Sequence, residues 1–303
     1  MELEPLSSAD RIEVSSAIIG LATASKRLAN AAIGHQPETP SVAATLLEDR
    51  FNSVRTWRGS APIRHAHEDV FFAELAAFDH MRAYVAAIDS PEVLSVSLAT
   101  IARGGIEAFG RAKWMVEPVS AAELVERHAA LTISDLRYII KLQAEKSLRR
   151  WGGKPISARE LEADVRSDLL SLGLDERQAP TPTGFASELL EEVLENNGRL
   201  QYSQISSIAH GESFAVNAFL DVHDADKSSP TSDSVSFGIP RSIAIEYALY
   251  LATCCAYVQR LIIDIFNVRA DEANLWDTAR TDSLARIAAL AASRVPPAGD
   301  RLP

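Results

Sequence analysis

Signals that begin and end helices recur from one end of this chain to the other, whereas strand signals are nearly absent. Ser120-x-x-Glu123 and Ser157-x-x-Glu160 are capping boxes, in which the serine and the glutamate satisfy free amide groups of a first helical turn. Gly152-Gly153 follows the helix expected after the first box and ends it. Because these signals are local, they restrict most of the chain to helices before any tertiary contact is considered.

The spacing of apolar residues between these signals predicts an all-α fold. We expect a single irregular multi-helix bundle of about nine or ten helices in one domain over residues 1–294, followed by a disordered tail over residues 295–303. The loop over residues 221–238 contains SVSFGI, which we expect to form one short extended piece. The expected helices cover residues 7–33, 41–57, 68–88, 91–116, 120–150, 157–172, 185–195, 199–220, 240–268 and 271–294.

The most apolar part of the chain runs from Pro240 to Val268. We expect it to be the central helix, around which the rest of the bundle packs. It contains Glu246, Arg260 and Asp264, and its longest uncharged run is shorter than the stretch of about 20 residues that spans a bilayer. The sequence therefore predicts a core helix and no association with membranes.

Cys254 and Cys255 are the only cysteines, and they are adjacent. Because a disulfide between neighbours closes a strained ring, we expect two free, buried thiols in a reducing compartment. The acidic start, MELEPLSSADRIEV, lacks the apolar run of a signal peptide. These features predict a cytoplasmic protein.

The formal net charge is −11, from 30 basic and 41 acidic residues. Such a surface repels nucleic-acid phosphates and anionic membranes. Nucleic acid is therefore an unexpected partner, although a local basic patch would still allow contact with RNA. A hydrophobic content of 47% excludes a globally disordered chain.

Arg103, Glu107 and Arg111 are spaced four residues apart and form one stripe of alternating charge on an expected helix. A solvated face with ion pairs inside the helix is one interpretation. The helix is apolar on all sides, however, which favours burial, and buried charges need partners. Gly104-Gly105 inside this helix would allow another helix or a ligand to approach closely.

Tyr202, Ser206 and His210 repeat this spacing at the edge of an apolar helix face. Two hydroxyls and an imidazole in a row could relay a proton or bind a polar ligand. They could equally be boundary residues that hydrogen-bond to neighbouring helices. We expect Arg103, Glu107 and His210 to meet in one buried or half-buried polar cluster.

The two rows lie in the segments RGGIEAFGRAKW (103–114) and YSQISSIAHG (202–211). Over about residues 91–220, the chain resembles uncharacterised all-helical proteins of actinobacteria. Those proteins pair an R-x-x-x-E helix with a later Y-x-x-x-S-x-x-x-H-G helix and have an arginine in the helix between, here Arg127. No activity is established for that group, and the chain resembles helical abortive-infection proteins and HEPN-type ribonucleases more distantly.

HEPN ribonucleases carry an arginine and a later histidine on one helix, with four to six residues between them. The pair with this spacing here is Arg58 and His65, which has Pro62 inside it and lies in an expected loop. His210 has no arginine at the required spacing. The spacing therefore gives no support to the nuclease motif.

His65, His67 and Glu68, with His80 further on, form a group that could bind a metal ion. The first three also match the solvated start of a helix, and we favour that interpretation. The sequence contains no phosphate-binding glycine loop, dinucleotide fingerprint or zinc knuckle. We therefore expect neither a metal nor a cofactor.

Two interpretations of function stay open, and with them the question whether the chain is an enzyme. In the first, it is a non-catalytic helical protein whose buried polar rows serve packing or bind a partner, either a second copy or another protein. In the second, it is a HEPN-like ribonuclease, toxin or phage-defence effector. Its active site would then gather candidates from the two rows and from Arg127, namely Arg103, Glu107, Arg111, Arg127, Tyr202, Ser206 and His210.

Overall fold

The computed structural model describes residues 4–33, 37, 39–90, 95–142, 148–149, 153–195, 197–216, 220–223, 234–237 and 239–293. The predicted tail over residues 295–303 lies outside this range. The helices are α1 (Ser8–Ile33), α2 (Val42–Leu47), the 3-10 helix η1 (Arg50–Ser53), α3 (Pro62–Asp89), α4 (Ser95–Val116), α5 (Ala121–Lys141), α6 (Ala158–Leu172), α7 (Pro182–Val193), α8 (Gly198–Ala209), α9 (Ser213–Val216), α10 (Arg241–Phe266) and α11 (Ala270–Ala292).

The predicted all-α, multi-helix bundle is confirmed. Within the described ranges, extended structure is limited to antiparallel pairs of short strands: β1 (Arg55–Thr56) with β2 (Gly59–Ser60), β3 (Leu148–Arg149) with β4 (Pro155–Ile156), and β5 (Leu220–His223) with β6 (Ser234–Phe237). The last strand contains the SVSF segment for which an extended piece is predicted.

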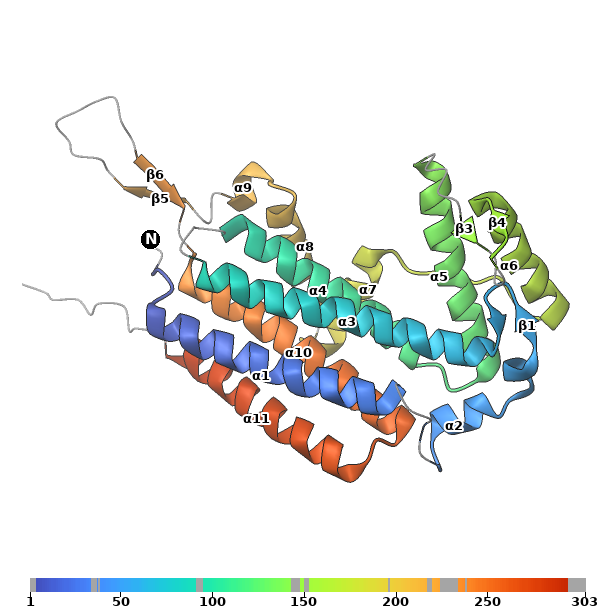
Figure 1. Cartoon of the computed structure of the whole chain (residues 1–303). Helices are drawn as coiled ribbons and strands as arrows, with labels where there is room; N and C mark the ends of the chain where they lie inside the picture. The colour runs from blue at the N-terminus through green and yellow to red at the C-terminus, as the bar shows by residue number, and fades with distance from the viewer. Residues whose placement is uncertain are drawn as a thin grey trace, which may run out of the picture.

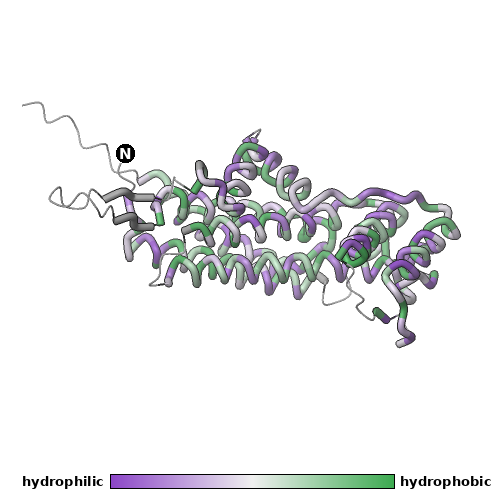
Figure 2. The backbone as a smooth tube through the Cα atoms, turned by 90° about the horizontal axis from the view of Figure 1, so that it is seen from above, coloured by the Kyte–Doolittle hydropathy of each residue, from purple (hydrophilic) through white to green (hydrophobic). Residues whose placement is uncertain are grey.

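The helices form a long bundle with a smaller pair of helices at one end. Helices α1, α3, α4, α10 and α11 run alongside one another, while α5 and α6 stand at a steep angle to them (Figure 1). Helices α7 and α8 pack on each other and on α4. Seen from above, hydrophobic and hydrophilic residues alternate along the helices, as expected for helices with one face in a core (Figure 2).

Helix α10 is a core helix, as its composition predicts, and it packs against α1, α2, α4, α7 and α11. By length and apolar content alone, α10 could cross a membrane. The argument that its uncharged run is too short to span a bilayer therefore does not hold. More than half of its most apolar stretch is nevertheless buried inside the bundle. Helix α4 is equally central, because it packs against α3, α5, α7, α8 and α10.

Two glycines let neighbouring helices approach α4 closely, as the sequence predicts. A Cβ atom on Gly104 would lie 2.5 Å from Cε1 of His80 on α3. A Cβ atom on Gly105 would lie 2.7 Å from Cδ2 of Leu251 on α10. Real Cβ atoms do not approach other atoms so closely, so the Gly-Gly pair is explained by helix packing.

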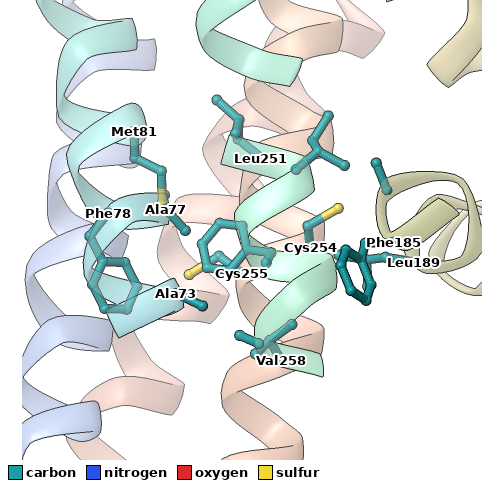
Figure 3. Packing of buried hydrophobic residues seen from close by; sticks show 14 of the residues in the cluster. Ala73, Ala77, Phe78, Met81, Phe185, Leu189, Leu251, Cys254, Cys255 and Val258 are labelled. Atoms are coloured by element: carbon teal, nitrogen blue, oxygen red, sulfur yellow. The ribbon is translucent and has the colours of Figure 1, made fainter. Parts of the chain in front are cut away.

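The core between α3, α7 and α10 is shown in Figure 3. Cys254 and Cys255 are both fully buried there and free, which confirms the predicted thiols. Each cysteine therefore acts as a small apolar side chain in a close-packed interior. The labelled neighbours are Ala73, Ala77, Phe78, Met81, Phe185, Leu189, Leu251 and Val258.

Several helix ends differ from the predicted ones. Helix α3 begins at Pro62 rather than at residue 68, because a proline suits the first turn, where no amide is needed. The helix expected over residues 41–57 ends at Leu47, and η1 and the β1–β2 hairpin follow. The helix expected over residues 199–220 ends at Ala209, because Gly211 takes a left-handed conformation with φ of 71°.

Candidate functional site

Four of the predicted side chains meet where α8 packs on α4. Nε of Arg103 donates to Oε1 of Glu107 at 2.7 Å and to the hydroxyl oxygen of Tyr202 at 3.2 Å. The Tyr202 hydroxyl donates to the same Glu107 oxygen at 2.6 Å. Nη1 of Arg103 lies 2.9 Å from Nε2 of His210. The expected meeting of Arg103, Glu107 and His210 is therefore present, with Arg103 as the link between the other two.

Local sequence positions each member of this group, which we call the Arg103 cluster (Arg103, Glu107, Tyr202 and His210). Arg103 and Glu107 are one helical turn apart on α4. Tyr202 is in the first half of α8, and His210 is the C-cap residue whose amide donates to the Ser206 carbonyl at 2.9 Å. The helix end thus holds the His210 ring at the rim, two turns from the buried Tyr202.

Exposure increases across the cluster from Tyr202 to His210. Tyr202 is buried, the side chains of Arg103 and Glu107 keep 21% and 22% of their surface, and His210 is exposed. Burial, and then the bond to Glu107, raises the pKa of Tyr202, which therefore stays a neutral donor. Burial opposes the charge of Arg103, but its bonds to Glu107 and Tyr202 outweigh that effect and raise its pKa.

The contact between Arg103 and His210 fixes the state of the imidazole. A guanidinium group can only donate hydrogen bonds, so Nε2 of His210 must accept, and the ring proton lies on Nδ1. Among the residues that the structure describes, Nη2 of Arg103 has no acceptor. Within the described part of the chain, the cluster therefore presents a guanidinium N–H group without an acceptor beside the exposed His210 imidazole.

Arg111 points to a different part of the molecule. It lies two helical turns after Arg103, a rise of about 12 Å along α4. Its Nη2 donates to Oδ2 of Asp135 on α5 at 3.0 Å, and its side chain lines a cavity there. The stripe of alternating charge is thus divided between two sites.

Arg127 does not join the cluster either, so the expectation that it converges with Arg103 and His210 is wrong. Its Nη2 donates to Glu123 at 2.8 Å, and its guanidinium lies 5.0 Å from the centre of the Trp114 ring. Its Nη1 donates to the Trp114 carbonyl. Helix α5 starts just after α4 ends, so Arg127 folds back on that end and stabilises the corner. The half-buried Ser206 has no side-chain hydrogen bond to any cluster residue in the described part of the chain.

The histidines near the start of α3 are not a solvated helix start, contrary to the favoured interpretation. His65 and His67 are both buried, and His67 packs edge-on against Phe266 at 5.0 Å between ring centres. Burial lowers the pKa of His67 to about 4, so its ring is neutral. Among the described residues, no three His, Cys, Asp or Glu side chains lie close enough to hold a metal ion.

Sequence reasoning missed two further polar pairs. Nδ1 of His128 on α5 lies 2.6 Å from Oδ2 of Asp69 on α3, and Nε2 of Gln259 on α10 donates to Oε1 of the fully buried Glu74 on α3. The partners are 59 and 185 residues apart. No spacing along the chain signals either pair, because tertiary packing alone brings them together.

No family model, no curated protein and no solved structure matches this chain.

Proposed function

We propose that the chain is a non-catalytic, cytoplasmic helical protein that binds a protein partner through Arg103 and His210. One observation carries the proposal: Glu107 and Tyr202 hold Arg103 while its outer donors remain beside the exposed His210. A partner carboxylate could accept a charge-assisted hydrogen bond from Nη2 of this guanidinium.

A held arginine is better suited to binding than a free one. An unrestrained arginine loses about 0.5–1.5 kcal/mol of side-chain entropy when a partner immobilises it. The bonds to Glu107 and Tyr202 restrain Arg103 before the partner arrives. The entropy cost of ordering the Arg103 side chain therefore arises during folding and does not weaken association with the partner.

The charge of the chain selects the kind of partner. With a net charge of −11, the surface as a whole repels nucleic-acid phosphates. A single carboxylate on a protein partner needs only the local positive edge of Arg103. The two free, buried cysteines are compatible with the reducing cytoplasm in which we place this protein.

Photo-crosslinking in the native cells tests the proposal. A crosslinking residue placed at the exposed Glu212, next to the cluster, should trap the partner, and the mass of the product separates a second copy from another protein. Arg103→Gln and His210→Ala should each lower the crosslinked yield about tenfold, as expected for residues at the centre of an interface. The control Arg64→Gln, whose side chain is 74% exposed on α3, should leave the yield unchanged. Equal yields in all variants would contradict the proposal.

A metal-independent ribonuclease is the second candidate, and the Arg103–His210 contact favours it. Arginine can stabilise the charge of a phosphoryl transition state, and histidine can transfer protons. The two residues come from α4 and α8, so they do not reproduce the spacing of the HEPN motif within one helix. Labelled single-stranded RNA incubated with the pure protein decides between the candidates: cleavage that His210→Ala abolishes would replace the partner-binding proposal.

A further inference from the structure

A cavity of about 400 Å³ lies where α5 and α6 meet the rest of the bundle. Its wall combines residues of α3, α4, α5, α6, β3 and the turn between β1 and β2. Ligand cavities occur preferentially where two packing units of a protein meet, and this volume is within their usual range of about 300–1,000 Å³. The cavity is separate from the Arg103 cluster, none of whose residues lines it.

One side of the cavity is positively charged. Arg58, Arg111 and Arg149 line it together with Asp69 and Asp135. Arg58 pairs with Asp69 at 2.7 Å and Arg111 pairs with Asp135 at 3.0 Å. Arg149 donates to the Gly153 carbonyl, and no carboxylate within the described ranges pairs with it. The wall therefore has one positive charge in excess, on a chain with a net charge of −11.

The other side of the cavity is apolar and held in place. Trp57 lines it together with Leu131, Leu136 and Leu161. The Trp57 ring stacks on the ring of His128 at 5.3 Å between centres and 23° between planes. Nδ1 of His128 is in turn bonded to Asp69, the partner of Arg58. One chain of contacts thus fixes both the aromatic wall and one of the arginines.

Two buried nitrogen atoms beside this wall lack a hydrogen-bond partner among the described residues. They are Nε1 of Trp57 and Nε2 of His128. A buried polar group without a partner destabilises a fold, so such a group needs an explanation.

We infer that this cavity binds a small molecule that joins a flat apolar ring to one oxyanion, with the ring against Trp57 and the oxyanion against Arg111 and Arg149. Phosphate and carboxylate share this chemistry. The oxyanion would replace Asp135 as the partner of Arg111. That replacement costs little, since the Asp135 side chain is 59% exposed and exposed ion pairs contribute little to stability.

Isothermal titration calorimetry with four probes tests the inference on the full chain. Phenyl phosphate and benzoate carry both a ring and an oxyanion, whereas inorganic phosphate and phenol carry one part each. At least one of the first two should bind with one site per chain, and about tenfold more tightly than either single-part probe. The stronger of the two identifies the oxyanion. Affinity for inorganic phosphate equal to that for phenyl phosphate, or no saturable heat with any probe, would overturn the inference.

Two variants test the location of the site. Arg111→Gln should weaken binding of the ring-bearing probe about tenfold, through loss of one charge-assisted contact. Arg137→Gln is the matched control, because Arg137 lies on the neighbouring helix α5, is 55% exposed and pairs with Glu162, and neither of these two residues lines the cavity. Both positions are at least one third exposed, so both variants should keep the helical circular dichroism spectrum of the parent. Unchanged binding in Arg111→Gln would contradict the assignment.

Discussion

Two polar groups of this bundle, each formed between two helices, differ in how they meet water. The Arg103 cluster lies half-exposed between α4 and α8, and its carboxylate faces a guanidinium and a phenol. Glu74 and Gln259 lie fully buried between α3 and α10. Nε2 of Gln259 donates to Oε1 of Glu74, but Oε2 of Glu74 and Oε1 of Gln259 have no partner among the described residues.

The two groups differ in whether they carry a charge. Burial raises the pKa of Glu74 to about 8, from an ordinary value of 4.5, so the carboxyl is mostly protonated at neutral pH. The proton on Oε2 can then be donated to Oε1 of Gln259. We expect this one proton to satisfy both atoms and to complete an acid–amide pair without a charge. The Arg103 cluster therefore keeps its charges, whereas the fully buried pair is held without one.

The largest expected effect is on the apolar interface between α10 and α4. Leu251 is fully buried on α10, and its side chain lies against Gly105 of α4. Leu251→Ala should lower the free energy of unfolding by about 2–5 kcal/mol, because it removes buried methyl groups and leaves a cavity. Urea denaturation measures the change. Leu170→Ala, at a side chain that is 81% exposed, is the control and should change stability by less than about 0.5 kcal/mol.

The next largest effect is expected when the titrating group of the buried pair, Glu74, is removed. Between pH 4.5 and about 8, folded Glu74 holds a proton that the unfolded chain has lost, so stability must fall as pH rises through this window. The slope from this group is about 1.4 kcal/mol per pH unit at most. Glu74→Gln replaces the acid with an amide that can pair with Gln259 at any pH. We expect this variant to be more stable than the parent by on the order of 3 kcal/mol at pH 8.

The stability of both proteins should be measured by denaturation at several pH values. The difference between the variant and the parent should grow from pH 4.5 to about 8 and then level off. A difference that is the same at every pH would mean that Glu74 does not titrate in this window, and the neutral acid–amide pair would have to be abandoned.

A smaller effect is expected where the Arg103 cluster is most buried. Tyr202→Phe removes the hydroxyl that donates to Glu107 and keeps the ring. We expect a loss of about 1–2 kcal/mol in the free energy of unfolding, because one bond to a charged acceptor is lost. Tyr138→Phe, on an exposed side chain of α5, is the matched control and should have no measurable effect. Equal stability of Tyr202→Phe and the control would mean that this bond does not hold the cluster together.

Local signals explain which parts of the fold could be predicted. The serine caps of α5 and α6 act within their own first turns, and both helices begin where Ser120 and Ser157 predict. The start of α3 was missed, although Pro62 is a local signal, because the Gly59-Ser60 segment before it suggested a continuing loop. The true end of α5, at Lys141, has no strong breaker in the sequence.

The candidate site was predictable only in part. Arg103, Glu107, Tyr202 and His210 could be found because two four-residue spacings mark two helix faces. Arg127 could not be placed, since its position depends on the angle of the corner between α4 and α5. Glu74 was passed over because a lone acid on an apolar face carries no spacing signal, and its partner is 185 residues away.

The most direct test asks whether His210 stabilises the packing of the helices or is available at the surface for binding. A double-mutant cycle of Glu107→Gln and His210→Ala, read as the free energy of unfolding, separates these roles. Since His210 is exposed and meets Glu107 only through Arg103, we predict that His210→Ala changes stability by less than about 0.5 kcal/mol and that the two changes add. A loss above about 1 kcal/mol in His210→Ala, with a coupling energy of similar size, would make the cluster a packing device and contradict the proposed binding surface.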